Sequence, residues 1–233
     1  QPYMEGKLGS VTVEYRMLRK DGSWIWTMGR GMVVERDAQG KPLRMIGTNS
    51  DITQRKQVEA LVSQLAYHDS LTQLPNRRLL FDRMSQAMSA SKRSGDYGAL
   101  MMLDLDNFKP LNDAYGHFAG DLLLNDVAVR LIECVRGTDT VARVGGDEFV
   151  VMLSKLDADK VVATRLAGEV AEKIRASLAK PYRLNLNEES QGGATVEHCC
   201  SASIGVVLFL GAEASQAEVM KCADSAMYRA KDG

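Results

Sequence analysis

The chain has 233 residues, of which 45% are hydrophobic and 25% charged, with a formal net charge of −1 at pH 7. This is the composition of an ordinary globular protein with one or two domains. A charge so close to zero gives no basic surface for nucleic acid or an anionic membrane. The longest apolar runs, such as Val206–Leu210, are far shorter than the roughly 20 residues that span a bilayer.

The four cysteines offer no metal-binding spacing. They lie in apolar stretches, where a free thiol behaves as a small hydrophobic group, so we expect buried structural thiols in a reducing cytoplasm. The opening residues do not have the pattern of a signal peptide. We therefore expect a cytoplasmic fragment of a longer parent protein, which could itself be anchored in a membrane.

Residues 8–52 are predicted to form three strands joined by tight turns. "VTVEYRML" alternates apolar and polar residues, and the turn sequences "KDG" and "DAQG" separate it from "WIWTMGRGMVVE" and "PLRMIGTNSDIT". Three strands alone are marginally stable, so we expect further structure before Gln1.

A helix is predicted over Asp51–Asp69, where Asp51 and Gln54 have the spacing of a capping box. Val58, Leu61, Val62 and Leu65 then form a single apolar stripe at helical spacing. The stripe fits a linker helix packed on one domain, and it fits equally well a short coiled-coil seam between two protomers.

Residues 69–233 alternate between helical and strand patterns, which predicts an α/β domain with helices covering a central sheet. Helices are expected over 76–95, 119–137, 157–181 and 216–231, and strands over 97–108, on both sides of Gly145-Gly146, and over 182–184 and 196–209. Gly137 suits a left-handed helix end, and Ser215 with Glu218 forms a capping box.

Carboxylates interrupt two of these strands. Asp104 and Asp106 end an apolar strand, and their spacing places both on one face if the strand continues. In "VARVGGDEFVVML", two apolar arms flank Gly145-Gly146, which predicts a hairpin with Asp147 and Glu148 at its tip. Glycine there tolerates positive φ and allows close approach. Clustered acids favour a divalent cation, with Mg²⁺ the best fit, although a solvated hairpin tip with ordinary surface acids remains an alternative.

The sequence "GGDEF" at residues 145–149 resembles the signature of the GGDEF family, the diguanylate cyclases. Further stretches resemble family blocks in family order: "HDSLTQLPNRR", "DLDNFKPLNDAYGHFAGDLLL", "SASIGV" and "ADSAMYRAK". The resemblance implies a nucleotidyl-cyclase-like fold with a mostly antiparallel central sheet covered by helices. It implies residues 69–233 as the cyclase domain and 53–68 as a helical signalling linker. The family pattern continues beyond Gly233.

Upstream, residues 1–52 resemble the C-terminal part of a PAS sensor domain, with "EYRMLRKDGSWIW" and "IGTNSDITQRK" as its most similar stretches. The resemblance covers only a small β-meander. No ligand can be assigned to this part.

The family implies that two GTP molecules are condensed into cyclic di-GMP with release of two pyrophosphates. By resemblance, Asp104, Asp147 and the Leu105 carbonyl would bind Mg²⁺, or Mn²⁺ as the alternative. Glu148 would stay near the metal and triphosphate, as a second-metal ligand or in activating the 3′-hydroxyl.

The same resemblance assigns the nucleotide contacts. Lys109 and Lys231 match phosphate-binding positions, and the backbone amides of Asn107, Phe108 and Lys109 would cradle the phosphates. Asn112 and Asp121 match guanine-reading positions, because a carboxylate accepts from guanine N1–H and N2–H₂ while adenine presents no such pair of donors. Taken singly, Asp121 and Lys231 also suit the helix dipole and Asn112 suits a turn.

Arg136 and Asp139, in "RGTD", match the family's RxxD inhibitory site, which binds the product. An arginine fork suits phosphate or the guanine Hoogsteen edge. A helix-ending arginine followed by a turn aspartate is the alternative interpretation.

One site holds one GTP, yet the product has two equivalent phosphodiester bonds. Two protomers must therefore face each other across a two-fold axis, and a PAS domain would control their orientation through the linker. The main alternative is a catalytically silent module that senses GTP or cyclic di-GMP and regulates a neighbouring domain such as an EAL phosphodiesterase. A cyclase with relaxed base choice is a weaker alternative, against which Asp121 argues.

Overall fold

The computed structural model describes residues 10–186 and 195–232. Its contacts divide the chain into two compact units, residues 1–64 and 65–233, and each unit is described by itself. None of the described helices is both long enough and apolar enough to cross a membrane.

The first unit is an antiparallel meander of β1 (Val11–Leu18), β2 (Trp24–Arg36) and β3 (Pro42–Asp51), in that spatial order. These are the three predicted strands. Gly22 and Gly40 adopt φ values of 85° and 82° in the two predicted turns, a conformation that glycine adopts without steric cost.

Helix α1 (Thr53–Tyr67) follows β3 directly and runs across the boundary between the units. The Thr53 backbone N–H donates to Asp51 Oδ1, and Arg55 and Lys56 pair with Glu14 of β1. None of the helix residues is buried. The apolar stripe is therefore not packed on the described chain: Val58, Leu61, Val62 and Leu65 are 53%, 55%, 59% and 59% exposed.

The second unit contains helices and strands in alternation. In chain order they are α2 (Arg77–Ser94), β4 (Gly98–Leu105), α3 (Phe108–Tyr115), α4 (His117–Cys134), β5 (Thr140–Gly145), β6 (Glu148–Leu153), α5 (Lys160–Leu178), β7 (Tyr182–Asn185), β8 (Thr195–His198), β9 (Ala202–Phe209) and α6 (Gln216–Lys231). Within the described residues, the central sheet has the order β5-β6-β4-β9 with every neighbouring pair antiparallel, and β7 and β8 form a separate ribbon. The predicted α/β fold with a mostly antiparallel sheet is confirmed.

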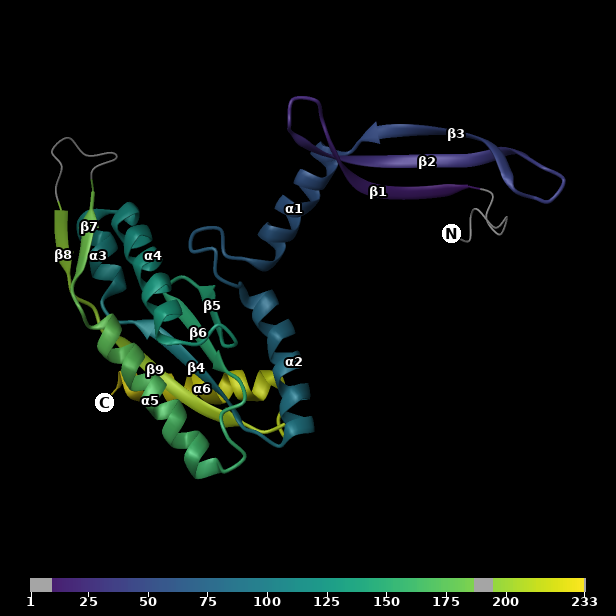
Figure 1. The fold of residues 1–233 in the computed structure, drawn as a ribbon. Coiled ribbons are helices and arrows are strands. Elements are labelled where there is room, and N and C mark those ends of the chain that lie inside the picture. The colour runs from purple at the N-terminus through teal and green to yellow at the C-terminus, as the bar shows by residue number, and fades with distance from the viewer. Residues whose placement is uncertain (1–9, 187–194, 233) are drawn as a thin grey trace. The chain divides into compact units, whose positions relative to one another are not determined.

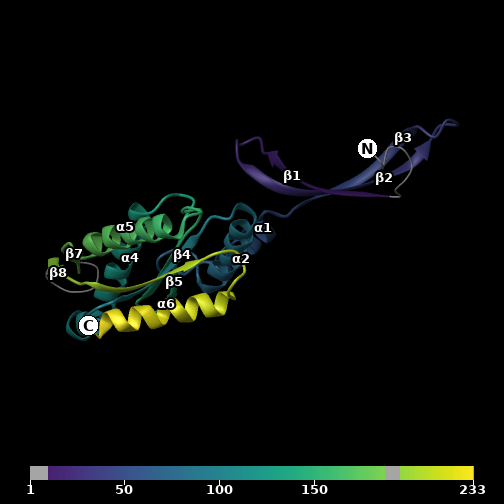
Figure 2. The ribbon, with the colours of Figure 1, turned by 90° about the horizontal axis from the view of Figure 1, so that it is seen from below.

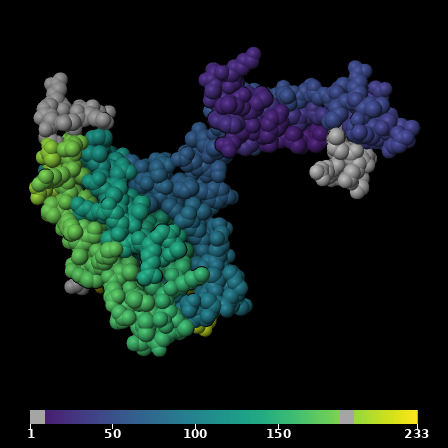
Figure 3. Space-filling model, in the orientation of Figure 1, coloured from purple at the N-terminus to yellow at the C-terminus, as the bar shows by residue number. Residues whose placement is uncertain are grey.

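The central strand β4 divides the core because its side chains alternate between two buried layers. Met101 and Leu103 pack with α4 and α5, whereas Leu100 and Met102 pack with α2 and α6. Figures 1 and 2 show α6 on the opposite side of the sheet from α4 and α5. In Figure 3, the atoms of α4 and α5 form a continuous surface over the sheet. A strand buried on both faces needs the continuous apolar run that this one has.

Several helix boundaries agree with the sequence and others do not. Gly95 ends α2 with φ of 80°, and the capping box of Ser215 and Glu218 begins α6, as predicted. Helix α4 ends at Cys134, so the expected helix end at Gly137 is wrong, and Gly137 is not in the left-handed region. Helix α3 was not predicted.

The cysteine prediction is half wrong. Cys134 and Cys200 are buried, but Cys199 and Cys222 are exposed. Cys199 begins the irregular stretch between β8 and β9, and Cys222 lies on an exposed part of α6. An apolar neighbourhood in sequence does not imply burial at either position.

Candidate active site

Two carboxylates meet where β4 and β6 pair at the edge of the sheet. Asp104 lies opposite Glu148 in the register of these strands and opposite Ser203 of β9 on its other side. The β5–β6 turn is only Gly146 and Asp147 long, so it holds Asp147 next to this pair. The sheet thus brings together Asp104, Asp147 and Glu148, three of the predicted site residues.

The structure shows only part of the role expected of Gly145 and Gly146. Neither is among the glycines with positive φ. A Cβ at Gly145 would lie 2.9 Å from Glu148 Oε2, whereas a Cβ at Gly146 would meet nothing within 4 Å. Close approach is thus found at Gly145, where the nearest atom is the end of the flexible Glu148 side chain, and positive φ is found at neither glycine.

The charged form of the Asp147 carboxyl is unfavourable in the metal-free protein. Burial raises the pKa of the Asp147 carboxyl, and the nearby charge of Asp104 raises this pKa further, while Lys231 and Arg143 partly oppose both effects. A carboxylate held beside another in a partly buried position favours binding a cation.

Lys231, from the last turn of α6, is the cation that contacts this cluster. Its Nζ lies 2.5 Å from Asp104 Oδ1, and the bond to Asp104 is the main cause of the raised pKa of Lys231. Asp104 is largely shielded, with 15% of its side chain exposed, whereas 47% of the Lys231 side chain is exposed. Lys231 can therefore turn outward when another cation occupies Asp104.

Asp106 does not join Asp104 on one face of the strand. Strand β4 ends at Leu105, and the Asp106 carboxylate accepts hydrogen bonds from Ser201 Oγ at 2.6 Å and Ser203 Oγ at 3.0 Å. Its backbone N–H also donates to the Ser201 carbonyl. Asp106 thus ties the end of β4 to β9, and the expectation based on spacing is wrong for this residue.

The turn after β4 leads directly into α3. Asn107 is the N-cap of α3 and adopts φ of 61°. Its side chain accepts no hydrogen bond from the first backbone N–H groups of the helix. Phe108 is half-buried and packs against the core, and Lys109 is exposed beside it. This is the geometry expected of a backbone cradle for phosphate.

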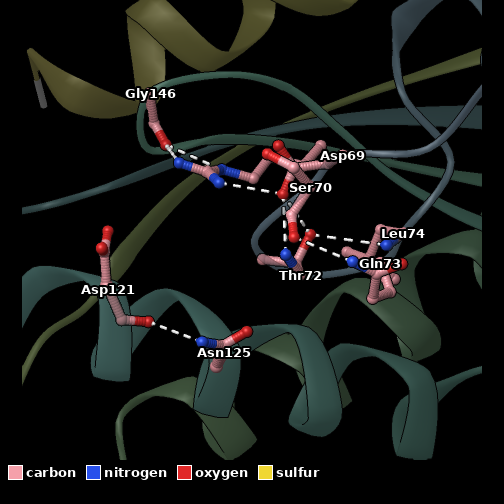
Figure 4. A network of polar contacts seen from close by, with 9 residues as sticks. Asp69, Ser70, Thr72, Gln73, Leu74, Asp121, Asn125 and Gly146 are labelled. Carbon is pink, nitrogen blue, oxygen red and sulfur yellow. Dashed lines mark hydrogen bonds and ion pairs between the residues drawn. The ribbon is translucent and has the colours of Figure 1, made fainter. Parts of the chain in front are cut away.

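Asn112 and Asp121 lie on the adjacent helices α3 and α4. Asn112 Oδ1 is buried with no hydrogen-bond partner among the described residues, which leaves an acceptor available to a ligand. It fits there because α4 carries Gly120, where a Cβ would lie 2.1 Å from this oxygen. The Asp121 carboxylate is exposed, while its carbonyl accepts from Asn125 in the helix (Figure 4).

Arg136 and Asp139 lie together in the turn between α4 and β5. Asp139 Oδ2 accepts from the Arg136 backbone N–H at 3.0 Å, and Asp139 Oδ1 accepts from the Ser154 N–H at 3.3 Å. Both residues line a cavity of about 330 Å³ together with Lys173 of α5. The Asp139 carboxylate thus stabilises the turn while facing this cavity.

Asp69 and Arg143 are residues of this site that the sequence reasoning did not single out. Arg143 donates to the Gly146 carbonyl through Nε and Nη2, at 3.0 and 2.7 Å, and to Asp69 Oδ1 through Nη1, at 2.9 Å. Figure 4 draws these contacts to Asp69 and to the Gly146 carbonyl as dashed lines. The turn that carries Asp147 is thus fastened to the segment that follows α1. An arginine two residues before the first signature glycine was the only available signal.

The donor set fits a magnesium ion that completes its coordination with substrate oxygens. Among the described residues, no group of three or more histidine, cysteine, aspartate or glutamate side chains could hold a metal by itself. Asp104 and Asp147 form a pair, and Mg²⁺ is commonly held by one or two carboxylates plus phosphate oxygens.

Known proteins that are similar to this chain are named for enzymes of cyclic di-GMP metabolism. Among curated proteins, the bifunctional diguanylate cyclase/cyclic di-GMP phosphodiesterase MucR of Pseudomonas aeruginosa is 45% identical over 170 residues, which are 72% of this chain and 22% of MucR. The cyclic di-GMP phosphodiesterase PdeR of Escherichia coli is 34% identical over 189 residues, which are 81% of this chain and 26% of PdeR. The chain thus spans about a quarter of the length of these relatives.

A solved structure and two family models are also similar to this chain. The coiled coil and GGDEF domain of DgcB from Caulobacter crescentus, in complex with c-di-GMP, matches with a TM-score of 0.65 at 26% identity, over 78% of this chain and 89% of that chain. A family model described as "PAS fold" matches residues 3–49, and one described as "Diguanylate cyclase, GGDEF domain" matches residues 66–233. The chain belongs to the GGDEF family of diguanylate cyclase domains, preceded by part of a PAS domain.

Proposed function

We propose that this chain is a diguanylate cyclase that condenses two GTP into cyclic di-GMP and two pyrophosphates. The observation that carries the proposal is the pairing of Asp104 with Asp147 at the sheet edge, with Lys231 bonded to Asp104. Each 3′-hydroxyl attacks the α-phosphorus of the other nucleotide. Two phosphodiester bonds form, two α–β phosphoanhydride bonds break, and each hydroxyl proton passes to a base or to solvent.

The residues divide this work by position. Asp104, Asp147 and the Leu105 carbonyl would hold Mg²⁺, or Mn²⁺ in its place, and the ion would supply charge neutralisation at the leaving pyrophosphate. Lys109, Lys231 and the amides at the start of α3 bind the phosphates. Glu148 lies opposite Asp104 and would act as a second-metal ligand or activate the 3′-hydroxyl.

Base choice rests on α3 and α4. The unpartnered Oδ1 of Asn112 and the exposed carboxylate of Asp121 are both acceptors, so they suit the N1–H and N2–H₂ donors of guanine. A purine without these donors would leave Asn112 Oδ1 buried and unpaired, which costs about 1–3 kcal/mol. We therefore propose GTP as the substrate, in the cytoplasm where it is made.

The reaction needs a homodimer, because each site holds one nucleotide. The four apolar side chains of α1, all more than half exposed in this chain, supply a seam for a second copy. Through this helix, the PAS part controls how the two catalytic units face each other. Product bound at Arg136 and Asp139, in the cavity that they share, inhibits the enzyme.

Substitution of the paired carboxylates tests the proposal. Asp147→Asn removes the charge and keeps the shape, so we expect cyclic di-GMP formation from GTP and Mg²⁺ to fall at least about 100-fold, as lost charge stabilisation in the transition state does. Asp82→Asn on α2, an exposed acid away from the sheet edge, should keep normal turnover. Equal turnover in the two variants would refute the assignment.

A second candidate is a silent module that binds GTP or cyclic di-GMP and regulates a neighbouring domain. The similarity to PdeR, named as a phosphodiesterase, favours it. The two candidates differ in one measurement: the silent module binds GTP without forming any phosphodiester bond, at every protein concentration.

A further inference from the structure

A cationic cavity lies beside the signature turn and has no place in the proposed chemistry. Its volume is about 490 Å³, and its lining includes Asp69, Asn76, Arg77, Arg78, Arg143 and Gly146. Three guanidiniums face one carboxylate in this lining, so the cavity has a net charge of about +2.

The acceptors of the cavity wall are already occupied. Asp69 Oδ1 accepts from the Thr72 backbone N–H, the Thr72 hydroxyl and Arg143 Nη1. The Gly146 carbonyl accepts twice from Arg143 (Figure 4). Neither group is therefore free to neutralise the other two arginines.

Arg77 and Arg78 have unused donors. Neither side chain forms a hydrogen bond or ion pair with any residue in the described ranges 10–186 and 195–232. They are held only by aromatic rings: Arg77 lies 5.9 Å from the ring centre of Phe81, and Arg78 lies 4.9 Å from that of Tyr67. Stacking of this kind orients a guanidinium while leaving its N–H groups available for a bidentate acceptor.

The position of these arginines is fixed by the start of α2. Asn76 Oδ1 caps the helix by accepting from the Arg78 and Leu79 N–H groups, and Asn76 Nδ2 donates to the Ala66 carbonyl. The positive end of the helix dipole adds to the charge of the two side chains. The cavity therefore presents a preorganised site for an anion.

The cationic cavity adjoins the part of the sheet that carries Asp147 and Glu148. Arg77 also lines a neighbouring cavity of about 380 Å³, which includes Glu148 and Lys221. The glycines of the signature turn border the cationic cavity, and Asp147 follows them directly. A nucleotide presented to this edge by another protomer would bring its phosphates close to Arg77 and Arg78.

We propose that Arg77 and Arg78 bind a phosphate of the nucleotide held by a second copy of the domain, and so align its 3′-hydroxyl with the local α-phosphate. This inference rests on the proposed function, because it needs two nucleotides in facing sites. Bidentate guanidinium–phosphate contacts supply the orientation that such an attack requires.

The first test asks whether the cavity binds phosphate at all. Inorganic pyrophosphate is titrated into the metal-free chain while the arginine Nε–Hε signals are followed by NMR. The Arg77 and Arg78 signals should shift in a saturable way, and that of Arg93, an exposed arginine in the last turn of α2, should not. No shift at Arg77 and Arg78 overturns the proposal whether or not the chain is a cyclase.

The second test asks whether the arginines act on the partner's nucleotide. The double variant R77Q/R78Q should bind GTP as the wild-type chain does but lose about 10- to 100-fold in cyclic di-GMP turnover, while Arg93→Gln keeps full turnover. Normal turnover of R77Q/R78Q would assign the site to a free anion and overturn the role toward a partner. A wild-type chain that makes no cyclic di-GMP would refute the proposed function, and the titration would still decide the phosphate site.

Mixing two inactive variants separates action within a protomer from action across the dimer. In a mixed dimer of R77Q/R78Q and Asp147→Asn, the first protomer keeps its carboxylates and the second supplies its arginines. Under the proposal, the arginines and carboxylates of one protomer serve the same bond, and neither protomer of the mixed dimer has both. The mixture should therefore make no more of the linear dinucleotide pppGpG than the two variants make alone. Appearance of pppGpG in the mixture, with mixed dimers confirmed by sedimentation, would show that the arginines orient their own protomer's nucleotide and would contradict action across the dimer.

Discussion

Removing the charge of Asp69 should loosen the turn that carries Asp147. Asp69 Oδ1 accepts an ion-paired hydrogen bond from Arg143 at 2.9 Å, and the two side chains are only 23% and 13% exposed. Asp69→Asn keeps an acceptor for Thr72 but loses the ionic bond. A partly shielded, charge-assisted bond contributes about 1–2 kcal/mol, above the value of an exposed pair.

Thermal and urea unfolding measure this loss. For a domain of this size, about 1–2 kcal/mol corresponds to a fall in Tm of about 2–8 °C. Asp82→Asn, an exposed aspartate on α2, should change the unfolding free energy by less than about 0.5 kcal/mol. Cyclic di-GMP turnover of Asp69→Asn should fall as well, because Arg143 would hold the turn less firmly. An Asp69→Asn protein as stable as the Asp82→Asn control would refute the proposed contribution of the Asp69–Arg143 contact to stability.

The pH dependence gives an independent measure of the same contact. Burial alone would raise the pKa of Asp69, but hydrogen bonds from Thr72 and Arg143 outweigh it and hold this pKa below its usual value. A depressed pKa stabilises the folded state above the unfolded pKa of about 4, and this contribution is lost as pH falls through the folded value. The stability difference between wild type and Asp69→Asn should therefore be full at pH 6 and shrink below about pH 4.

Three further predictions concern packing and charge near the site. Gly205→Ala should cost about 3 kcal/mol in unfolding free energy, because its Cβ would lie 2.1 Å from the Met227 backbone nitrogen. Gly168→Ala, whose Cβ would meet nothing within 4 Å, should instead stabilise α5 by about 0.5–1 kcal/mol. Equal effects of the two substitutions in urea unfolding would contradict this. Gly120→Ala should displace Asn112 and weaken GTP binding about tenfold by calorimetry, or about 1.4 kcal/mol, and unchanged affinity would remove Asn112 from the base site. Asp147→Asn should raise the Tm of the metal-free protein at pH 7. Burial and the charge of Asp104 raise the pKa of Asp147, so its negative charge opposes folding at this pH. A lower Tm of the variant would contradict this effect of the charge.

The sequence predicts the layers of this fold well, for a physical reason. The uninterrupted apolar run of β4 and the amphipathic helices on either side permit few other arrangements. The short helix α3 was missed because Pro110 and the strand residues before it suggest an extended segment. The end of α4 was misplaced because Gly137 suits a helix terminus, yet the chain had already left the helix at Val135.

The candidate site was less accessible from sequence than the fold. Spacing suggested that Asp104 and Asp106 act together, but the strand ends between them, and the serines of β9 bind Asp106. The contact of Asp69 with Arg143 joins residues 74 positions apart, so no local pattern reveals it. The role of Gly120 likewise depends on how α3 crosses α4, which only the structure provides.

The central claim is that the carboxylates at this sheet edge make cyclic di-GMP from two facing GTP molecules. The most direct test incubates the chain with GTP and Mg²⁺ over a range of protein concentrations and identifies the products by mass. The account predicts cyclic di-GMP and pyrophosphate in a 1:2 ratio, with turnover per chain rising as protomers pair. GTP that stays intact at concentrations where the chain is dimeric would contradict it.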